Sequence, residues 1–254
     1  MITFVKRLLY VFVLTILGSS LSTAATLEQM AGQMIVVGFQ GDSVDDPAVA
    51  GLRSDLAASR LGGVMLLKTN IKSLDAVGRM NAAFRAASPD LPPFITLDQE
   101  GGVVERLTRD VGFREIPSAA AIAASDTPAQ AEAIYARMAA SIADLGFTVN
   151  FGPVADVNLN PKNPVIGRFG RSYSADPTVV ARYDAAFIAA HHAAGLLTAL
   201  KHFPGHGSSA ADSHEGFVDI TQTWQAEELD PYRDLIAAGD VDMIMAGHLY
   251  HADY

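Results

Sequence analysis

The residues best suited to chemistry lie in one segment, residues 201–214, which reads KHFPGHGSSAADSH. An apolar run at residues 196–200 precedes it and has the composition of a buried strand, so Lys201 and His202 are predicted to stand where that strand ends. The carboxyl end of a strand is where α/β proteins carry out chemistry. A proline and two glycines then exclude a helix, and the small residues that follow predict a mobile loop.

Asp212 and His214 lie two residues apart at the end of this loop. A carboxylate at that spacing can hold one imidazole nitrogen and leave the other nitrogen facing a substrate, as in catalytic triads. A histidine held in this way is a general acid and base near neutral pH. We therefore predict a catalytic pair; the alternative is a loop histidine that only meets solvent.

Four further histidines raise other interpretations. His202 and His206 have an H-x-x-x-H spacing, but a proline and a glycine between them break the helix that would place both on one face. No H-E-x-x-H motif is present. We therefore expect no metal and no other cofactor, with a metal-dependent hydrolase as the alternative. His191 and His192 lie among alanines in a predicted helix and are expected to be structural.

A second polar cluster follows the predicted strand at residues 94–97, where the segment 98–107 reads DQEGGVVERL. Asp98 and Glu100 flank a predicted turn whose glycines, Gly101–Gly102, let the backbone approach a ligand closely, and Arg106 can neutralise or orient the two acids. Asp with Arg at a strand end also suits sugar hydroxyls, which both donate and accept hydrogen bonds. An ordinary surface ion pair is the alternative.

The segment 150–177 is long, poor in helix formers and rich in Asn, Pro and Gly. We predict an ordered loop over the mouth of the fold and not a crossover helix. Arg168 and Arg171 lie within it and are candidates to point inward, the alternative being that both are solvated.

Short β-rich runs alternate with helical stretches along the chain. This alternation indicates a parallel α/β sheet covered on both faces, either a TIM-type (β/α)8 barrel or an open doubly wound sheet. Polar residues follow most of the strands, and only a barrel gathers them around one mouth, so we predict the TIM-type barrel. Six strands are predicted, at residues 34–39, 63–67, 94–97, 148–151, 196–200 and 242–245.

Helix ends are marked by particular residues. We predict helix starts at Asp46–Pro47, at Asp176–Pro177 and at Asp126 with Pro128, because an acidic cap followed by proline is typical of a first turn. Helix ends are predicted where glycine leads into the next strand, at Gly62, Gly146, Gly195 and Gly239.

Residues 1–25 have the pattern of a secretory signal peptide, with Lys6 and Arg7 before an apolar run and small residues after it. We expect a secreted or periplasmic protein with no later membrane span. The remainder, residues 26–254, is predicted to form one domain. The chain has no cysteine, which excludes disulfides and cysteine chemistry, and its net charge of −10 argues against a nucleic-acid partner.

The combination of KHFPGHG with DSH, DQEGG with a following RL, and NPVIGRFGRSYS between them resembles glycoside hydrolase family 3, in its β-N-acetylhexosaminidase branch. The resemblance implies removal of terminal β-linked N-acetylglucosamine from peptidoglycan fragments or chitooligosaccharides, by a retaining mechanism. His214 would be the acid/base and Asp212 its partner. The sugar's hydroxyl and acetamido groups would be held by Asp98, Arg106, Arg171, Lys201 and His202.

Two departures from the family pattern affect the expectations. Val103 follows the two glycines, where the family often has a basic residue. The family's nucleophile, an aspartate in an S-D-D-like motif on the seventh strand, has no counterpart in the sequence, so we expect a barrel truncated after about six βα units and lacking its nucleophile. A catalytically inert sugar-binding relic of the same family is the alternative.

Overall fold

The computed structural model describes residues 25–253. The predicted signal peptide therefore lies, apart from Ala25, outside the described residues. None of the helices in the described part of the chain is long and apolar enough to span a membrane. The helices are α1 (Leu27–Gln33), α2 (Pro47–Ala57), α3 (Leu74–Ala87), α4 (Ala119–Ser125), α5 (Pro128–Asp144), α6 (Pro177–Ala193) and α7 (Asp230–Ala238), with short 3₁₀ turns η1 (Lys68–Asn70), η2 (Arg109–Val111), η3 (Gly167–Phe169) and η4 (Ala226–Leu229).

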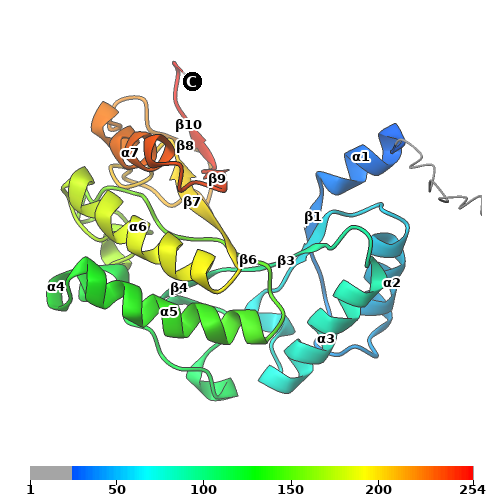
Figure 1. Ribbon diagram of the computed structural model, residues 1–254. Coiled ribbons are helices and arrows are strands. Elements are labelled where there is room, and N and C mark those ends of the chain that lie inside the picture. The colour runs from blue at the N-terminus through cyan, green and yellow to red at the C-terminus, as the bar shows by residue number, and fades with distance from the viewer. Residues whose placement is uncertain (1–24, 254) are drawn as a thin grey trace, which may run out of the picture.

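Six strands form one parallel sheet in the order β1-β2-β3-β6-β7-β9. The sheet curls, and helices cover its outer face, as in part of a barrel (Figure 1). This confirms the prediction of a TIM-type barrel fold with six parallel strands. The six are β1 (Val36–Gly38), β2 (Gly63–Met65), β3 (Phe94–Leu97), β6 (Val149–Asn150), β7 (Leu197–Phe203) and β9 (Met243–Ala246).

Two small pairings lie outside this sheet. Strands β4 (Gln99–Gly101) and β5 (Val104–Glu105) form an antiparallel hairpin directly after β3. Strands β8 (Val218–Asp219) and β10 (Leu249–Tyr250) pair in parallel. The sequence analysis predicted a turn at the hairpin and missed the β8–β10 pair, because two-residue strands carry no periodic signal.

The predicted end of the fifth strand of the sheet, at residue 200, was wrong. Strand β7 continues to Phe203, so Lys201 and His202 lie inside the strand. Lys201 still pairs with Met245 of β9, and the register shifts between Lys201 and Phe203. Pro204, which has no N–H to continue a ladder, follows directly. Sheet pairing thus places Lys201, and His202 lies at the irregularity between two paired residues and not in a loop.

The predicted helix starts were correct for α2 and α6. Asp176 caps α6 by accepting a hydrogen bond from the Thr178 N–H at 2.8 Å. For α5 the predicted cap, Asp126, was wrong: the N-cap is Thr127, which exchanges hydrogen bonds with Gln130 in a capping box. The Thr127 hydroxyl, one residue later, thus caps the helix in place of the Asp126 carboxylate.

Three of the four predicted helix ends were correct. Gly146, Gly195 and Gly239 follow helices with φ between 76° and 85°, a conformation that favours glycine. Gly62 was wrongly predicted, because α2 already ends at Ala57 and Gly62 does not have a positive φ. A Cβ at Gly62 would stand 2.2 Å from the Gln33 carbonyl oxygen, so close packing against the end of α1 requires the glycine.

The core between the sheet and its helices is continued by aromatic residues of α5 and α6. The rings of Tyr135 and Phe187 meet edge to face, with centroids 4.8 Å apart. The Tyr135 hydroxyl also lies 2.6 Å from the Tyr173 hydroxyl, which comes from the long segment after β6. These contacts fasten that segment to the helices and so fix its position over the strand ends.

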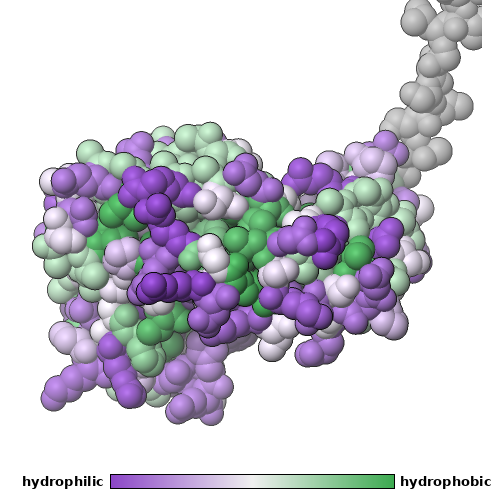
Figure 2. Space-filling view, turned by 90° about the horizontal axis from the view of Figure 1, so that it is seen from below, coloured by the Kyte–Doolittle hydropathy of each residue, from purple (hydrophilic) through white to green (hydrophobic). Residues whose placement is uncertain are grey.

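The two edge strands of the curled sheet, β1 and β9, have no neighbour on their outer sides among residues 25–253. Apolar side chains are exposed on or beside both edges, including Ile35, Val36 and Ile244. Figure 2 shows apolar surface in the hollow between the part of the molecule that carries α1 to α3 and the larger remainder. Exposed sheet edges with apolar side chains favour association with further structure.

Candidate active site

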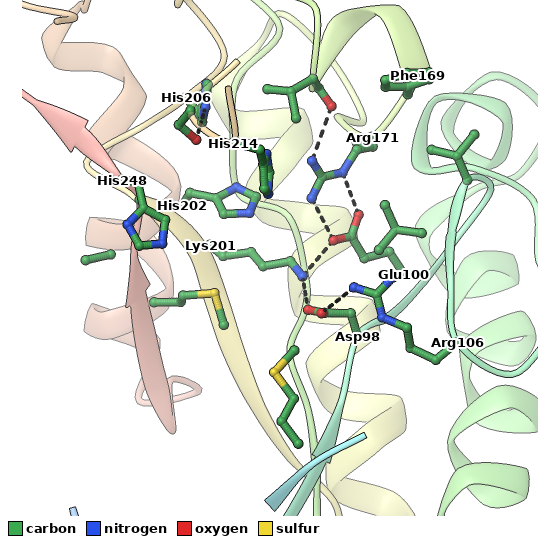
Figure 3. Close-up of a pocket in the computed structure, with 18 residues that line it drawn as sticks. Asp98, Glu100, Arg106, Phe169, Arg171, Lys201, His202, His206, His214 and His248 are labelled. Atoms are coloured by element: carbon green, nitrogen blue, oxygen red, sulfur yellow. Dashed lines mark hydrogen bonds and ion pairs between the residues drawn. The ribbon is translucent and has the colours of Figure 1, made fainter. Parts of the chain in front are cut away.

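A cavity of about 510 Å³ lies at the carboxyl ends of the strands (Figure 3). Its walls come from β2, β7 and β9, from the β4–β5 hairpin, from the segment after β6 and from the loop that carries His214. Polar and apolar side chains share the lining. Six of the seven predicted site residues line it, namely Asp98, Arg106, Arg171, Lys201, His202 and His214.

Lys201 stands at the centre of a buried ion cluster. Its ammonium group lies 2.8 Å from Asp98 Oδ1 and 2.6 Å from Glu100 Oε1, and its side chain is only 2% exposed. Asp98 directly follows β3 and Glu100 belongs to β4. One cation from β7 therefore joins the strand end to the hairpin that follows it, as Figure 3 shows.

Two arginines complete this cluster. The Arg171 guanidinium donates to both oxygens of Glu100, from Nη2 at 2.8 Å and from Nε at 2.9 Å. Arg106 Nη2 donates to Asp98 Oδ2 at 2.8 Å. Each carboxylate oxygen of Asp98 and Glu100 thus has a cationic partner. The five groups carry three positive and two negative charges, so the cluster has a net charge of +1.

The cluster controls the protonation of its acids. Burial alone would raise the pKa of Glu100, but the nearby charges of Lys201 and Arg171 outweigh it and lower that pKa to about 2. Burial likewise opposes ionisation of Asp98, and Lys201 and then Arg106 reverse this and lower its pKa. Both groups are therefore carboxylates at neutral pH, and neither can act there as a proton donor.

The glycine pair of DQEGG is required by local geometry. Gly101 and Gly102 have φ angles of 99° and 62°, which L-amino acids with side chains rarely adopt. A Cβ at Gly101 would stand 2.5 Å from the Pro117 carbonyl oxygen. The close approach of the backbone that these glycines permit is therefore to Pro117. The turn lets the hairpin fold back so that Arg106 reaches Asp98.

Segment 150–177 is an irregular loop, as predicted, with η3 and no longer helix before α6. Arg171 is buried within it, and its Nη1 also donates to the Val165 carbonyl oxygen at 3.2 Å. Arg168 is exposed, and its guanidinium carbon lies 5.5 Å from the centre of the Phe169 ring. Of the two candidate arginines, only Arg171 therefore points inward.

Asp156 supports the histidine that follows Lys201. Its Oδ2 accepts from His202 Nδ1 at 2.7 Å, and its Oδ1 accepts from the backbone N–H groups of His202 and His206. Burial would raise the pKa of Asp156, but the neighbouring His202 outweighs burial and lowers it. Asp156 is one of the polar residues that follow the predicted strands, and no pattern in the sequence indicated this role.

The two histidines of the H-x-x-x-H spacing, His202 and His206, do not face a common ligand position. The His202 and His206 rings are 6.1 Å apart, nearly perpendicular, and both ring nitrogens of His206 contact the hydroxyls of Ser209 and Ser213. Within residues 25–253 no group of three or more His, Cys, Asp or Glu side chains is arranged to hold a metal ion.

Asp212 and His214 form the predicted pair at the rim of the cavity. Asp212 Oδ1 accepts from His214 Nδ1 at 2.7 Å and from the His214 backbone N–H at 2.9 Å. These contacts, the backbone one foremost, lower the pKa of Asp212. The His214 side chain is 71% exposed and lines the cavity, whereas Asp212 lies behind it. With Nδ1 held by a carboxylate, Nε2 is the nitrogen left to exchange a proton with a ligand.

Residues 26–254 match the family model described as the glycosyl hydrolase family 3 N-terminal domain. The chain belongs to this family. The match extends over the whole curled sheet and all residues of the cavity, so the geometry above is that of the family's N-terminal domain.

Curated relatives are similar to the chain over most of its length. It is 34% identical over 247 residues to Beta-hexosaminidase A of Pseudoalteromonas piscicida, an alignment that covers 89% of this chain and 41% of the relative. It is 36% identical over 227 residues to a Beta-hexosaminidase of Stenotrophomonas maltophilia (strain R551-3), which covers 86% and 64%. The chain thus spans less than two thirds of the length of either relative.

A solved family 3 structure has the same fold. This is a beta-N-acetylglucosaminidase from Paenibacillus sp. str. FPU-7, which superposes with a TM-score of 0.81 at 32% sequence identity. The superposition covers 90% of this chain and 43% of the solved one. The curled sheet described above is therefore an arrangement that an experimental family 3 structure shares.

Replacing Arg171 with methionine should destabilise the fold strongly. Glu100, whose side chain is only 7% exposed, would keep Lys201 but lose both Arg171 contacts. Removing one partner of a buried ion pair costs about 3–5 kcal/mol, which urea unfolding would measure. Arg168→Met is the matched control in the same loop, and we expect a change below about 0.5 kcal/mol. Equal stability of the two variants would show that the ion pair does not support the fold.

Acid should weaken the fold through Glu100. Its folded-state pKa of about 2 is below its ordinary value of 4.5, so the unfolded chain binds the proton more readily between these two pH values. The stabilisation is complete above pH 4.5 and is lost as pH falls toward 2. Unfolding free energies measured over this range should fall less steeply for Glu100→Gln than for the wild type. Parallel curves would contradict the assigned pKa.

Proposed function

We propose that this chain forms the sugar-binding and acid/base part of a retaining β-N-acetylhexosaminidase. The observation that supports this most strongly is the convergence of the Asp98–Lys201–Glu100–Arg171 cluster and the Asp212–His214 pair on one cavity. The named activities of the relatives, Beta-hexosaminidase and beta-N-acetylglucosaminidase, point to the same reaction.

The ion cluster is suited to bind sugar hydroxyls. Asp98 and Arg106 are its most accessible members, with side chains 11% and 26% exposed, and they present an acceptor and a fork of donors side by side. A hydroxyl can donate to the carboxylate while it accepts from the guanidinium. Lys201 and Arg171 are more deeply buried and would contact the sugar only at their cavity-facing atoms, while His202 adds a ring held by Asp156.

His214 would protonate the oxygen of the leaving group and later activate water. Asp212 would hold its Nδ1 and stabilise the imidazolium form, so that Nε2 carries the transferred proton. The exposure of His214 at the rim suits this role, because the leaving group departs toward solvent. A histidine in this acid/base role is unusual, because most glycosidases use a carboxylic acid there.

The carboxylate that attacks the sugar would come from outside residues 25–253. A retaining glycosidase needs a nucleophile about 5–5.5 Å from its acid/base. Asp98 and Glu100 are the carboxylates that line the cavity, and every oxygen of both is paired with a cation. A covalent glycosyl adduct on either residue, detected by peptide mass spectrometry after trapping with a slow substrate, would contradict this assignment.

The substrate would be a terminal β-linked N-acetylglucosamine unit of peptidoglycan fragments or chitooligosaccharides. Export by residues 1–25 to a secreted or periplasmic location would bring the chain to such glycans. Because both cavity carboxylates are engaged, a sugar-binding protein without turnover is the second candidate. Tight binding of N-acetylglucosamine with no hydrolysis of an aryl glycoside by any natural form of the protein would favour it.

The role of His214 predicts a dependence on the leaving group. In a form of the protein that hydrolyses aryl glycosides, His214→Ala should slow turnover of chitobiose by about 10²–10⁴-fold. An aryl glycoside whose leaving group needs no proton should lose far less in the bond-cleavage step.

Steady-state and single-turnover rates on both substrates would measure this difference. His192→Gln is the control, because His192 lies on α6, does not line the cavity and pairs with Asp242. Equal losses of His214→Ala on both substrates would show that His214 does not act as the general acid.

A further inference from the structure

Gln99 lies between the two acids of the ion cluster and is completely buried. Its Oε1 accepts from the backbone N–H groups of Arg106 and Leu107 at 2.9 and 3.0 Å, and its Nε2 donates to the Leu107 carbonyl oxygen at 3.0 Å. One side chain thereby makes three hydrogen bonds to the far end of the β4–β5 hairpin. From that end of the hairpin the Arg106 side chain extends to Asp98.

The backbone of Gln99 is fixed from the opposite side by Asn150 of β6. Asn150 Oδ1 accepts from the Gln99 N–H at 2.9 Å, and Asn150 Nδ2 donates to the Gln99 carbonyl oxygen at 2.9 Å. This pair of bonds can form only with the amide in one orientation. Asp98 and Glu100 are the chain neighbours of Gln99, so Asn150 also fixes the backbone position from which both acidic side chains extend.

His191 of α6 selects that orientation. Its Nδ1 lies 2.8 Å from the Phe187 carbonyl oxygen, which can only accept, so Nδ1 carries the proton. Its Nε2 is then an acceptor, and it lies 3.0 Å from Asn150 Nδ2. The ring is buried and stacks on Phe187 with centroids 4.0 Å apart. Burial lowers the pKa of His191 to about 4, which keeps Nε2 unprotonated at neutral pH.

We propose that His191, Asn150 and Gln99 are positioning residues, which hold Asp98, Glu100 and Arg106 in the arrangement that binds the sugar. None of the three lines the cavity. They connect a helix on the outer face of the sheet to the ligand-binding groups through hydrogen bonds whose donors and acceptors are all assigned. The inference rests on the proposed sugar-binding function for its affinity measurement, but not for the titration described below.

The test compares Gln99→Met with Asn81→Leu. Asn81 is an equally buried amide on α3 that does not line the cavity. Its Nδ2 donates to the Leu145 carbonyl oxygen. At a temperature where both variants are folded, we expect Gln99→Met to bind N-acetylglucosamine about tenfold or more weakly than wild type. Asn81→Leu should bind as wild type. Wild-type affinity in Gln99→Met, or an equal loss in both variants, would overturn the proposal.

A second measurement needs no sugar. Carbon-13 NMR titration of the Asp98 carboxyl should show its lowered pKa in the wild type and in Asn81→Leu, and a higher pKa in Gln99→Met, because Arg106 is no longer held beside it. An unchanged pKa in Gln99→Met would overturn the proposal. If the wild type binds no N-acetylglucosamine, the proposed substrate is wrong, and this titration still decides the positioning role.

The contribution of His191 is tested by two replacements. His191→Phe keeps a ring but removes the acceptor for Asn150, whereas His191→Gln can supply an amide oxygen there. We expect the Asp98 pKa to rise in His191→Phe and to return toward the wild-type value in His191→Gln. No rise in His191→Phe, or an equal rise in both variants, would remove His191 from the proposed set.

Discussion

The structure depends on keeping two buried carboxylates paired with three cations. Asp98 and Glu100 meet Lys201, Arg171 and Arg106, and these five groups come from three separate places in the chain: the segment 98–106, the loop after β6 and strand β7. An uncompensated buried charge costs several kcal/mol, so a misplaced strand, hairpin or loop would be strongly disfavoured. The cluster therefore couples the correct fold of the sheet to the formation of the ligand-binding surface.

The other features of the site serve this cluster. The glycine turn lets the hairpin bring Arg106 back to Asp98, and the loop after β6, which Tyr173 connects to α5, places Arg171 against Glu100. The Asp212–His214 pair lies apart from the cluster, with His214 at the exposed rim of the cavity. In the proposed function, sugar binding and proton transfer would therefore fall to separate groups, one buried and the other exposed.

Sequence reasoning predicted the strands and the loops, and six of its seven candidate site residues line the cavity, because each has a local signal: apolar runs, glycine and proline, or charged residues beside a strand. Prediction from sequence failed where contacts with residues distant in the chain determine the structure. Strand β7 continues through Lys201 because Lys201 pairs with Met245 of β9, and the Lys201 side chain meets Asp98, 103 residues away in the sequence. The role of Asp156 and the link through His191 likewise depend on contacts across the sheet, which no window of sequence contains.

The most direct measurement of the central claim is a crystal structure of the protein with bound N-acetylglucosamine. The account predicts a sugar in the cavity whose hydroxyls lie within hydrogen-bond distance of Asp98 and Arg106, with the anomeric carbon turned toward His214. The ion pairs of Glu100 with Lys201 and Arg171 should remain intact beneath it. A sugar bound elsewhere, or one that breaks these pairs to reach Glu100, would contradict the account.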